Sequence, residues 1–153
     1  MEPSPSTTIS IPLPRSIKER IYIHLTHRAK AITIFVTTAT PDDAAAGVPT
    51  PFGSFVYSLP DRYNPTQPLS TPLCAEEETI EFSTRLAKLV ARRTGLPVYV
   101  GCSVSFKSTG LGGSVEEVME GFGAVVKGVM EGLEGLKKEK GVEERVEGLR
   151  IED

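Results

Sequence analysis

The feature that most constrains this fold is a helix pattern that stops abruptly and is followed at once by a strand pattern. From Ile80 to Val90, apolar side chains recur at spacings of three and four, and arginines close the stretch. This pattern is typical of a helix with one buried stripe and a cationic last turn. Gly95 then fits a left-handed helix cap, and Pro97 prevents continuation. The alternation from Val98 to Phe106 therefore predicts a strand.

Further strand patterns precede this helix. Residues 20–26 alternate between apolar and polar side chains, and residues 31–38 are β-branched and nearly continuous. With only a short connection between them, the two segments predict an antiparallel hairpin. Residues 54–59 are a third strand candidate. The proline-containing segments 40–53 and 60–72 are expected to be irregular connections.

A second helix is predicted to begin at Ser114. Serine followed three residues later by Glu117 forms a capping box, and an apolar stripe continues to Leu136. Five glycines interrupt this helix, and each costs about 1 kcal/mol relative to alanine, so packing must hold it together. They are Gly121, Gly123, Gly128, Gly132 and Gly135. For residues 137–153, a helical extension, an edge strand and disorder all remain open.

Together these elements predict an α+β fold with a single mostly antiparallel β-sheet and two main helices on one face. We expect a flexible N-terminal arm at residues 1–8, one domain at 9–136 and a charged tail at 137–153. The chain has 153 residues and 39% hydrophobic residues, enough for one modest core. It has no membrane-length apolar run and no secretory signal pattern, so we expect a cytoplasmic and also a nuclear location.

The charge distribution argues against nucleic acid as a partner. The net charge is −3, which divides into +2 for residues 1–115 and −5 for residues 116–153. Binding a phosphate backbone normally needs a basic surface, which this chain lacks overall. A local positive strip on the first helix is interpreted mainly as a solvated face, with a second contact surface as the alternative. The strip consists of Arg85, Lys88, Arg92 and Arg93.

Catalytic chemistry has weak support in the sequence. Lys107–Ser114 is a glycine-rich loop before a helix, where backbone amides can hold a phosphate, but it lacks the lysine-serine ending of a P-loop. We interpret it mainly as a connecting loop. His24 and His27 have no cysteine or carboxylate beside them, so a metal site is not expected. The carboxylates of Glu76, Glu77, Glu78 and Glu81 could in principle do acid/base work, but we interpret them as helix-start electrostatics. We predict no enzyme activity, no cofactor and no metal.

The two cysteines also give no indication of a reactive site. Cys74 falls in an expected loop and Cys102 in an expected buried strand. Two cysteines so placed make neither a disulfide framework nor a metal motif. We therefore expect two reduced thiols.

The second face of the predicted sheet is the strongest functional indication. If the apolar set of each strand faces the helices, the alternate set shares the opposite face. That set is Tyr22, His24, Thr26, Phe55, Tyr57 and Tyr99. Aromatic side chains among small polar ones are typical of a protein contact layer. We predict that this face is used for dimerisation.

Several short segments resemble the proteasome assembly chaperone 4 family, particularly its fungal members. The matching points are Arg62-Tyr63, Ser70–Leu73, Leu86-Ala87, Ala91–Thr94 and Val98–Val100. The resemblance covers about residues 9–136. It implies a non-enzymatic chaperone that pairs with a related small chaperone, proteasome assembly chaperone 3. It further implies that the pair guides assembly of the proteasome α-subunit ring through the α-5 subunit and leaves before the mature 20S particle forms.

Two other functions stay open at this level. One is a small enzyme that binds a phosphorylated substrate at residues 107–114, and the other is a homodimeric adaptor with no proteasome link. Residues 40–53 and the extension after Phe122 exceed the family pattern, so the resemblance implies no role for them. It also implies no particular residue that contacts the α-5 subunit.

Overall fold

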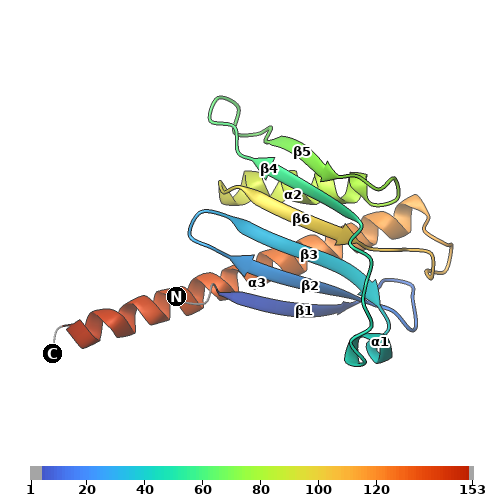
Figure 1. The fold of residues 1–153 in the computed structure, drawn as a ribbon, viewed down its shortest axis with the longest axis horizontal. Coiled ribbons are helices and arrows are strands. Elements are labelled where there is room, and N and C mark those ends of the chain that lie inside the picture. The colour runs from blue at the N-terminus through green and yellow to red at the C-terminus, as the bar shows by residue number, and fades with distance from the viewer. Residues whose placement is uncertain (1–4, 152–153) are drawn as a thin grey trace.

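The computed structural model describes residues 5–151, with side-chain detail through residue 139. Its strands form one six-stranded sheet in the order β1-β2-β3-β6-β4-β5 (Figure 1). In chain order the elements are β1 (Ser6–Pro12), β2 (Arg20–His27), β3 (Ile32–Ala39), α1 (Pro41–Ala45), β4 (Ser54–Leu59), β5 (Leu69–Cys74), α2 (Ile80–Thr94), β6 (Val98–Ser103) and α3 (Val115–Ile151).

The predicted helix, stop and strand are all present. Helix α2 ends at Thr94, and Gly95 adopts a left-handed conformation with φ of 69°, which a side chain would disfavour. Strand β6 follows after Pro97. At the start of α2, the buried hydroxyls of Ser54 and Thr79 lie 2.7 Å apart, which ties the beginning of β4 to the helix.

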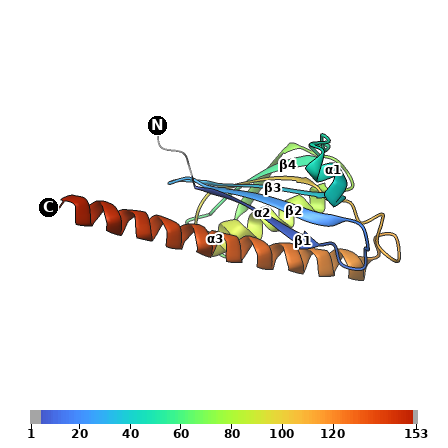
Figure 2. The ribbon, with the colours of Figure 1, turned by 90° about the horizontal axis from the view of Figure 1, so that it is seen from below.

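The sheet is mostly antiparallel, and the predicted hairpin is confirmed as β2 and β3. One pair, β3 with β6, is parallel, because the connection from α2 brings β6 back beside β3 in the same direction. Helices α2 and α3 cover the same face of the sheet (Figure 2). The chain therefore has the predicted α+β fold. We call the covered side the inner face and the other side the outer face.

The core lies between the inner face and the two helices. Ile23 of β2, Ile34 of β3 and Val100 of β6 are fully buried there, together with Leu86 of α2 and Val125 of α3. Burial of aliphatic side chains from both layers is the main contribution to the stability of such a fold. The core is thus built from the apolar half of each strand alternation.

The glycines of α3 allow the helix to approach the sheet closely. A methyl group on Gly132 would lie 2.6 Å from Ile9 Cδ1, and one on Gly128 would lie 3.3 Å from Ile23 Cδ1. Gly121 packs equally tightly against the Phe106 ring. By contrast, Gly123 and Gly135 face open space. Three of the five glycines therefore serve the packing that the sequence pattern required.

Part of the predicted N-terminal arm is a strand, and residues 1–4 of it lie outside the described residues. We expected residues 1–8 to be flexible, but β1 begins at Ser6 and pairs with β2 from Ser6↔Thr26 to Pro12↔Arg20. The alternation of Ile9 and Ile11 with serine and threonine explains the strand, because those isoleucines pack against the core.

Three connections also differ from expectation. The segment expected to be irregular at 60–72 contains the start of edge strand β5, and 40–53 contains the short helix α1. Strand β6 ends at Ser103, so Phe106 leaves the sheet and packs against Phe82 with ring centroids 6.0 Å apart. Proline content favoured a loop at β5, whereas pairing with β4 made it a strand. Helix α1 forms locally, because the Thr40 side chain caps it.

Helix α3 continues to Ile151, so the part of the tail that the structure describes is a helical extension. It projects beyond the sheet (Figure 1). Within the described residues, no helix combines the length and the apolar character needed to cross a membrane.

Candidate protein-interaction face

The six residues predicted for the contact layer all lie on the outer face of the sheet. Their strand neighbours, among them Ile21, Ile23 and Val100, are buried against the helices. Since successive side chains of a strand point to opposite sides, the alternate residues must point outward. We call the outer side chains the outer-face set: Tyr22, His24, Thr26, Phe55, Tyr57 and Tyr99. None of them is buried.

Aromatic rings from three strands and one connection form a continuous row on this face. The Tyr57 and Tyr99 ring centroids lie 4.7 Å apart, and Tyr99 stacks on Phe55 at 5.9 Å. Phe55 in turn lies 6.4 Å from Phe35 and 5.4 Å from Phe52. These separations fall in the range of favourable ring contacts. We call these five residues the aromatic row.

Sequence reasoning missed two members of the aromatic row. Phe35 lies in the nearly continuous apolar strand, where the alternation was not visible, and Phe52 lies in the expected loop. They are 40% and 56% exposed. The signal for Phe35 was the hairpin register, because Phe35 is the direct cross-strand partner of His24. No local pattern marks Phe52.

A glycine makes room for the aromatic row. Gly101 of β6 pairs with both Phe35 and Phe55, and a methyl group on it would lie 2.6 Å from Phe35 Cδ1. The Phe35 ring therefore lies over the backbone of β6, where a larger residue would displace it. A glycine inside a strand often marks such a close approach.

The outer face is also hollowed. A pocket of about 290 Å³ lies between the sheet and residues 50–52, and its lining includes Tyr22, His24 and Phe35. At one side of it, His24 Nδ1 and the Thr8 hydroxyl lie 3.1 Å apart. The face is thus mainly aromatic and small-polar, with one concave region.

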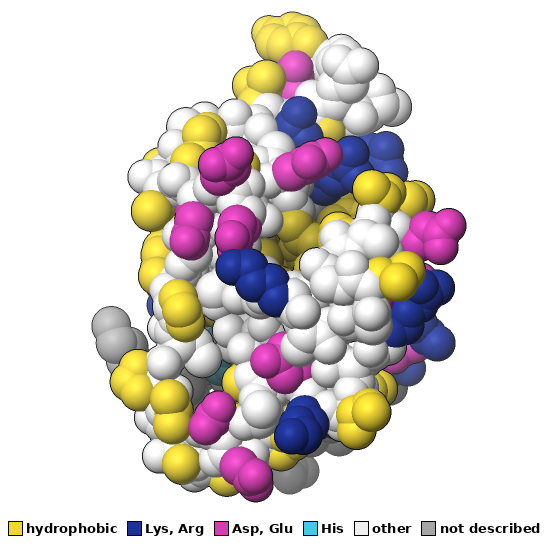
Figure 3. Space-filling view, turned by 90° about the vertical axis from the view of Figure 1, so that its right-hand side faces the viewer, with side chains coloured by type: hydrophobic (Ala, Val, Ile, Leu, Met, Phe, Trp, Pro, Cys, Tyr) yellow, Lys and Arg dark blue, Asp and Glu magenta, His cyan; other side chains and the backbone are white. Residues whose placement is uncertain are grey.

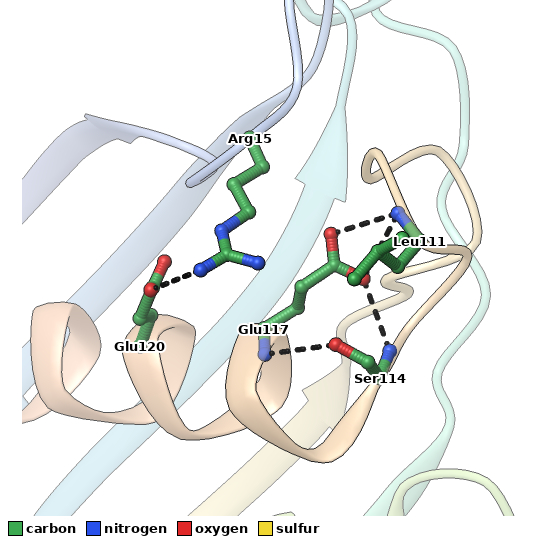
Figure 4. A network of polar contacts seen from close by, with 5 residues as sticks. All are labelled: Arg15, Leu111, Ser114, Glu117 and Glu120. Atoms are coloured by element: carbon green, nitrogen blue, oxygen red, sulfur yellow. Dashed lines mark hydrogen bonds and ion pairs between the residues drawn. The ribbon is translucent and has the colours of Figure 1, made fainter.

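The glycine-rich loop, in contrast, is organised around a carboxylate of the chain itself (Figure 4). The amide of Leu111 donates to Glu117 Oε2 at 3.0 Å, and the amides of Gly113 and Ser114 donate to Oε1 at 3.1 and 3.0 Å. The Glu117 amide donates back to the Ser114 hydroxyl at 3.3 Å, which completes the predicted capping box. Beside it, Arg15 and Glu120 form an ion pair at 2.8 Å.

These contacts determine the charge state of Glu117. Burial alone would raise the pKa of this carboxyl group, but the hydrogen bonds from Leu111, Ser114 and Gly113 outweigh it and lower the pKa to about 2. An ionised carboxylate therefore occupies the place where the amides of this loop could have held a phosphate. The geometry favours a connecting loop over a substrate site.

Other reactive groups are not assembled into a site. Cys102 is buried, and this burial raises the pKa of its thiol to about 11, which keeps it protonated. Cys74 is exposed and free. Across the described residues, no cluster of histidine, cysteine and carboxylate side chains is placed to hold a metal ion.

The second predicted contact surface lies on α2. Arg85, Lys88 and Arg92 line a groove between α2 and the start of β5, whereas Arg93 is exposed outside that groove. The spacing of three, four and seven residues explains why the first three share one side of the helix.

The fold and the uncovered aromatic face define a small α+β protein with a surface suited to protein contact. A family model for proteasome assembly chaperone 4 matches residues 20–104, from the start of β2 to just beyond β6. The chain belongs to the proteasome assembly chaperone 4 family.

The fold comparison agrees with this assignment. The chain is similar to a protein in the crystal structure of a novel chaperone complex for yeast 20S proteasome assembly, with a TM-score of 0.56. The match covers 86% of this chain and 97% of that one at 16% sequence identity, which shows a shared fold. No curated protein sequence matches the chain.

Proposed function

We propose that this chain is a non-enzymatic assembly chaperone for the α-subunit ring of the 20S proteasome. It acts as a heterodimer with the related small chaperone, proteasome assembly chaperone 3, in the cytoplasm and also in the nucleus. The pair binds the growing ring through the α-5 subunit and leaves before the mature particle forms. Membership of the family, matched over residues 20–104, supports this proposal.

The observation that carries the proposal is the uncovered outer face. Helices α2 and α3 both lie on the inner face, so they leave the aromatic row open on the outer face, where the connection at residues 50–52 lies over part of the sheet. Phe35 and Phe52 are exposed, and the other three rings are partly exposed. Apolar surface of this kind is costly to leave in water and marks protein contact sites. Tyrosine and phenylalanine are also enriched at the centres of interfaces.

A related partner can cover this face economically. Two sheets pack face to face about 10 Å apart, with interdigitating side chains. A chaperone of the same fold also has one sheet face free of helices, so the two outer faces can pack as a sandwich. The pocket beside Tyr22, His24 and Phe35 would then receive a side chain of the partner.

The proposal is tested by purification of the chain alone and with co-expressed proteasome assembly chaperone 3. Size-exclusion chromatography with light scattering should give a one-to-one heterodimer, and this heterodimer should retain the α-5 subunit when all three are co-expressed. A stable homodimer that binds neither proteasome assembly chaperone 3 nor the α-5 subunit would instead favour the adaptor function.

A phosphate titration followed by NMR separates the enzyme alternative. We expect no shifts at Gly110–Ser114, because the amides of Leu111, Gly113 and Ser114 already donate to Glu117. Saturable shifts confined to that loop would favour a phosphorylated substrate.

A further inference from the structure

A groove of about 660 Å³ lies between the start of β5 and α2, away from the outer face. We call it the basic groove, and its lining includes Leu69, Arg85, Lys88, Leu89, Arg92 and Phe122. Figure 3 views the molecule from one end and shows a hollow with hydrophobic side chains inside and both basic and acidic side chains around it. Among the residues that line the basic groove, Arg85, Lys88 and Arg92 are the charged ones, and we call these three side chains its cationic rim.

The cationic rim is largely unpartnered. Arg85 pairs with Glu81 at 2.8 Å, but the two side chains are 65% and 77% exposed, and such pairs contribute little and exchange easily. Within the part of the chain that the structure describes, no carboxylate lies at ion-pair distance from Lys88 or Arg92. The positive charges of the groove are thus free to receive an anionic ligand.

The rest of the groove favours an extended chain with an apolar side chain. Leu69 is 59% exposed, and Leu89 and Phe122 are partly buried, so all three retain apolar surface to cover. Strand β5 is the last strand of the described sheet, and its outer edge has no strand beside it. An edge strand offers backbone groups to an extended segment, although Pro72 lacks a donor and limits pairing to the start of β5.

We propose that the basic groove binds an acidic, extended segment of a partner protein that carries a hydrophobic side chain. Carboxylates of that segment pair with Lys88 and Arg92, and its apolar side chain packs on Leu69 and Phe122. A nucleic acid fits less well, because the chain carries a net charge of −3 and would repel a long polyanion outside the groove. This inference does not depend on the proposed function.

The test is fluorescence anisotropy with a fluorescein-labelled peptide of glutamates and aspartates around a central leucine. Binding to the full chain should be saturable and should weaken with salt. The variant K88E/R92E should weaken binding at least about tenfold, because two attractive pairs become repulsive. The matched control R28E/K30E, with the same charge change in the turn between β2 and β3, should stay within about twofold.

A second variant tests the apolar contact of the groove without changing its charge. Leu69→Ser should weaken the leucine peptide several-fold and leave an otherwise identical peptide with glycine at that place unchanged. Equal losses in the groove variant and the control variant would overturn the proposal. Tighter binding of an oligo-dT strand than of the peptide, with the same dependence on Lys88 and Arg92, would also overturn it in favour of phosphate-backbone binding.

Discussion

The two faces of the sheet are built from the same strands but differ in burial and in side-chain type. On the inner face, Ile23 and Val100 are fully buried under the helices, whereas their neighbours Tyr22 and Tyr99 point outward and remain partly exposed. The inner face is aliphatic, and the outer face is aromatic and small-polar. Because alternate residues build the two faces, the core and the outer face can be perturbed separately.

The largest expected effect on stability compares two neighbours of β2 that point to opposite faces, Ile23 and His24. Ile23→Ala should lower the free energy of unfolding by about 2–5 kcal/mol, since it leaves a cavity in the core. His24→Ala, on the exposed side of the same strand, should change it by less than about 0.5 kcal/mol. Urea unfolding followed by circular dichroism measures both, and comparable losses would mean that the outer face is also part of the core.

The loss of stability at acid pH should show how much the ionised Glu117 contributes to holding the start of α3. The pKa of Glu117 is about 2 in the folded chain against an ordinary 4.5, so its ionised form stabilises the fold. This contribution is complete above pH 4.5 and is lost as the pH falls from 4.5 toward 2.

The variant Glu117→Gln should therefore be less stable at neutral pH and should lose less stability on acidification than the unmodified chain. The matched control is Glu116→Gln, an exposed neighbour. Thermal unfolding between neutral and acidic pH measures the difference. If Glu117→Gln kept the full acid dependence, another group would be responsible for it.

A smaller effect than that of Ile23→Ala is expected at the glycines of α3. Gly132→Ala should destabilise the fold by about 1–3 kcal/mol, because a methyl group would press on Leu25 and Ile9. Gly123→Ala, which meets open space, should stabilise it by about 0.5–1 kcal/mol through helix propensity. Thermal unfolding gives the sign of each change. Stabilisation by Gly132→Ala, as expected for Gly123→Ala, would show that α3 does not pack closely on the sheet at Gly132.

Most elements that form the inner face and its helices could be predicted from the sequence. Strong periodicity and unambiguous stop residues such as Gly95 and Pro97 made α2 and β6 predictable. The capping box at Ser114 and Glu117 likewise marked the start of α3. These signals are local, so one sequence is enough to interpret them.

What the sequence did not reveal depends on contacts distant in the chain. The alternation at Ile9 and Ile11 is short, and pairing with β2 is what completes strand β1. Strand β5 likewise forms because β4 pairs with it. Phe52 joins the aromatic row because the connection before β4 returns over the sheet, as its ring contacts with Phe35 and Phe55 show. Glu117 also accepts hydrogen bonds from the amides of Leu111 and Gly113, which precede Ser114. These contacts could not be predicted without the geometry of the loop.

The most direct test is whether the aromatic row binds the partner proposed above. Tyr99→Glu places a charge in the middle of the row and should weaken binding to proteasome assembly chaperone 3 by at least about 2 kcal/mol, or roughly thirtyfold in Kd. The control Tyr63→Glu makes the same change at a 99% exposed tyrosine outside the row and should leave binding unchanged. Calorimetry on the two folded variants measures this, and equal affinities for Tyr99→Glu and the unmodified chain would contradict the outer face as the interface.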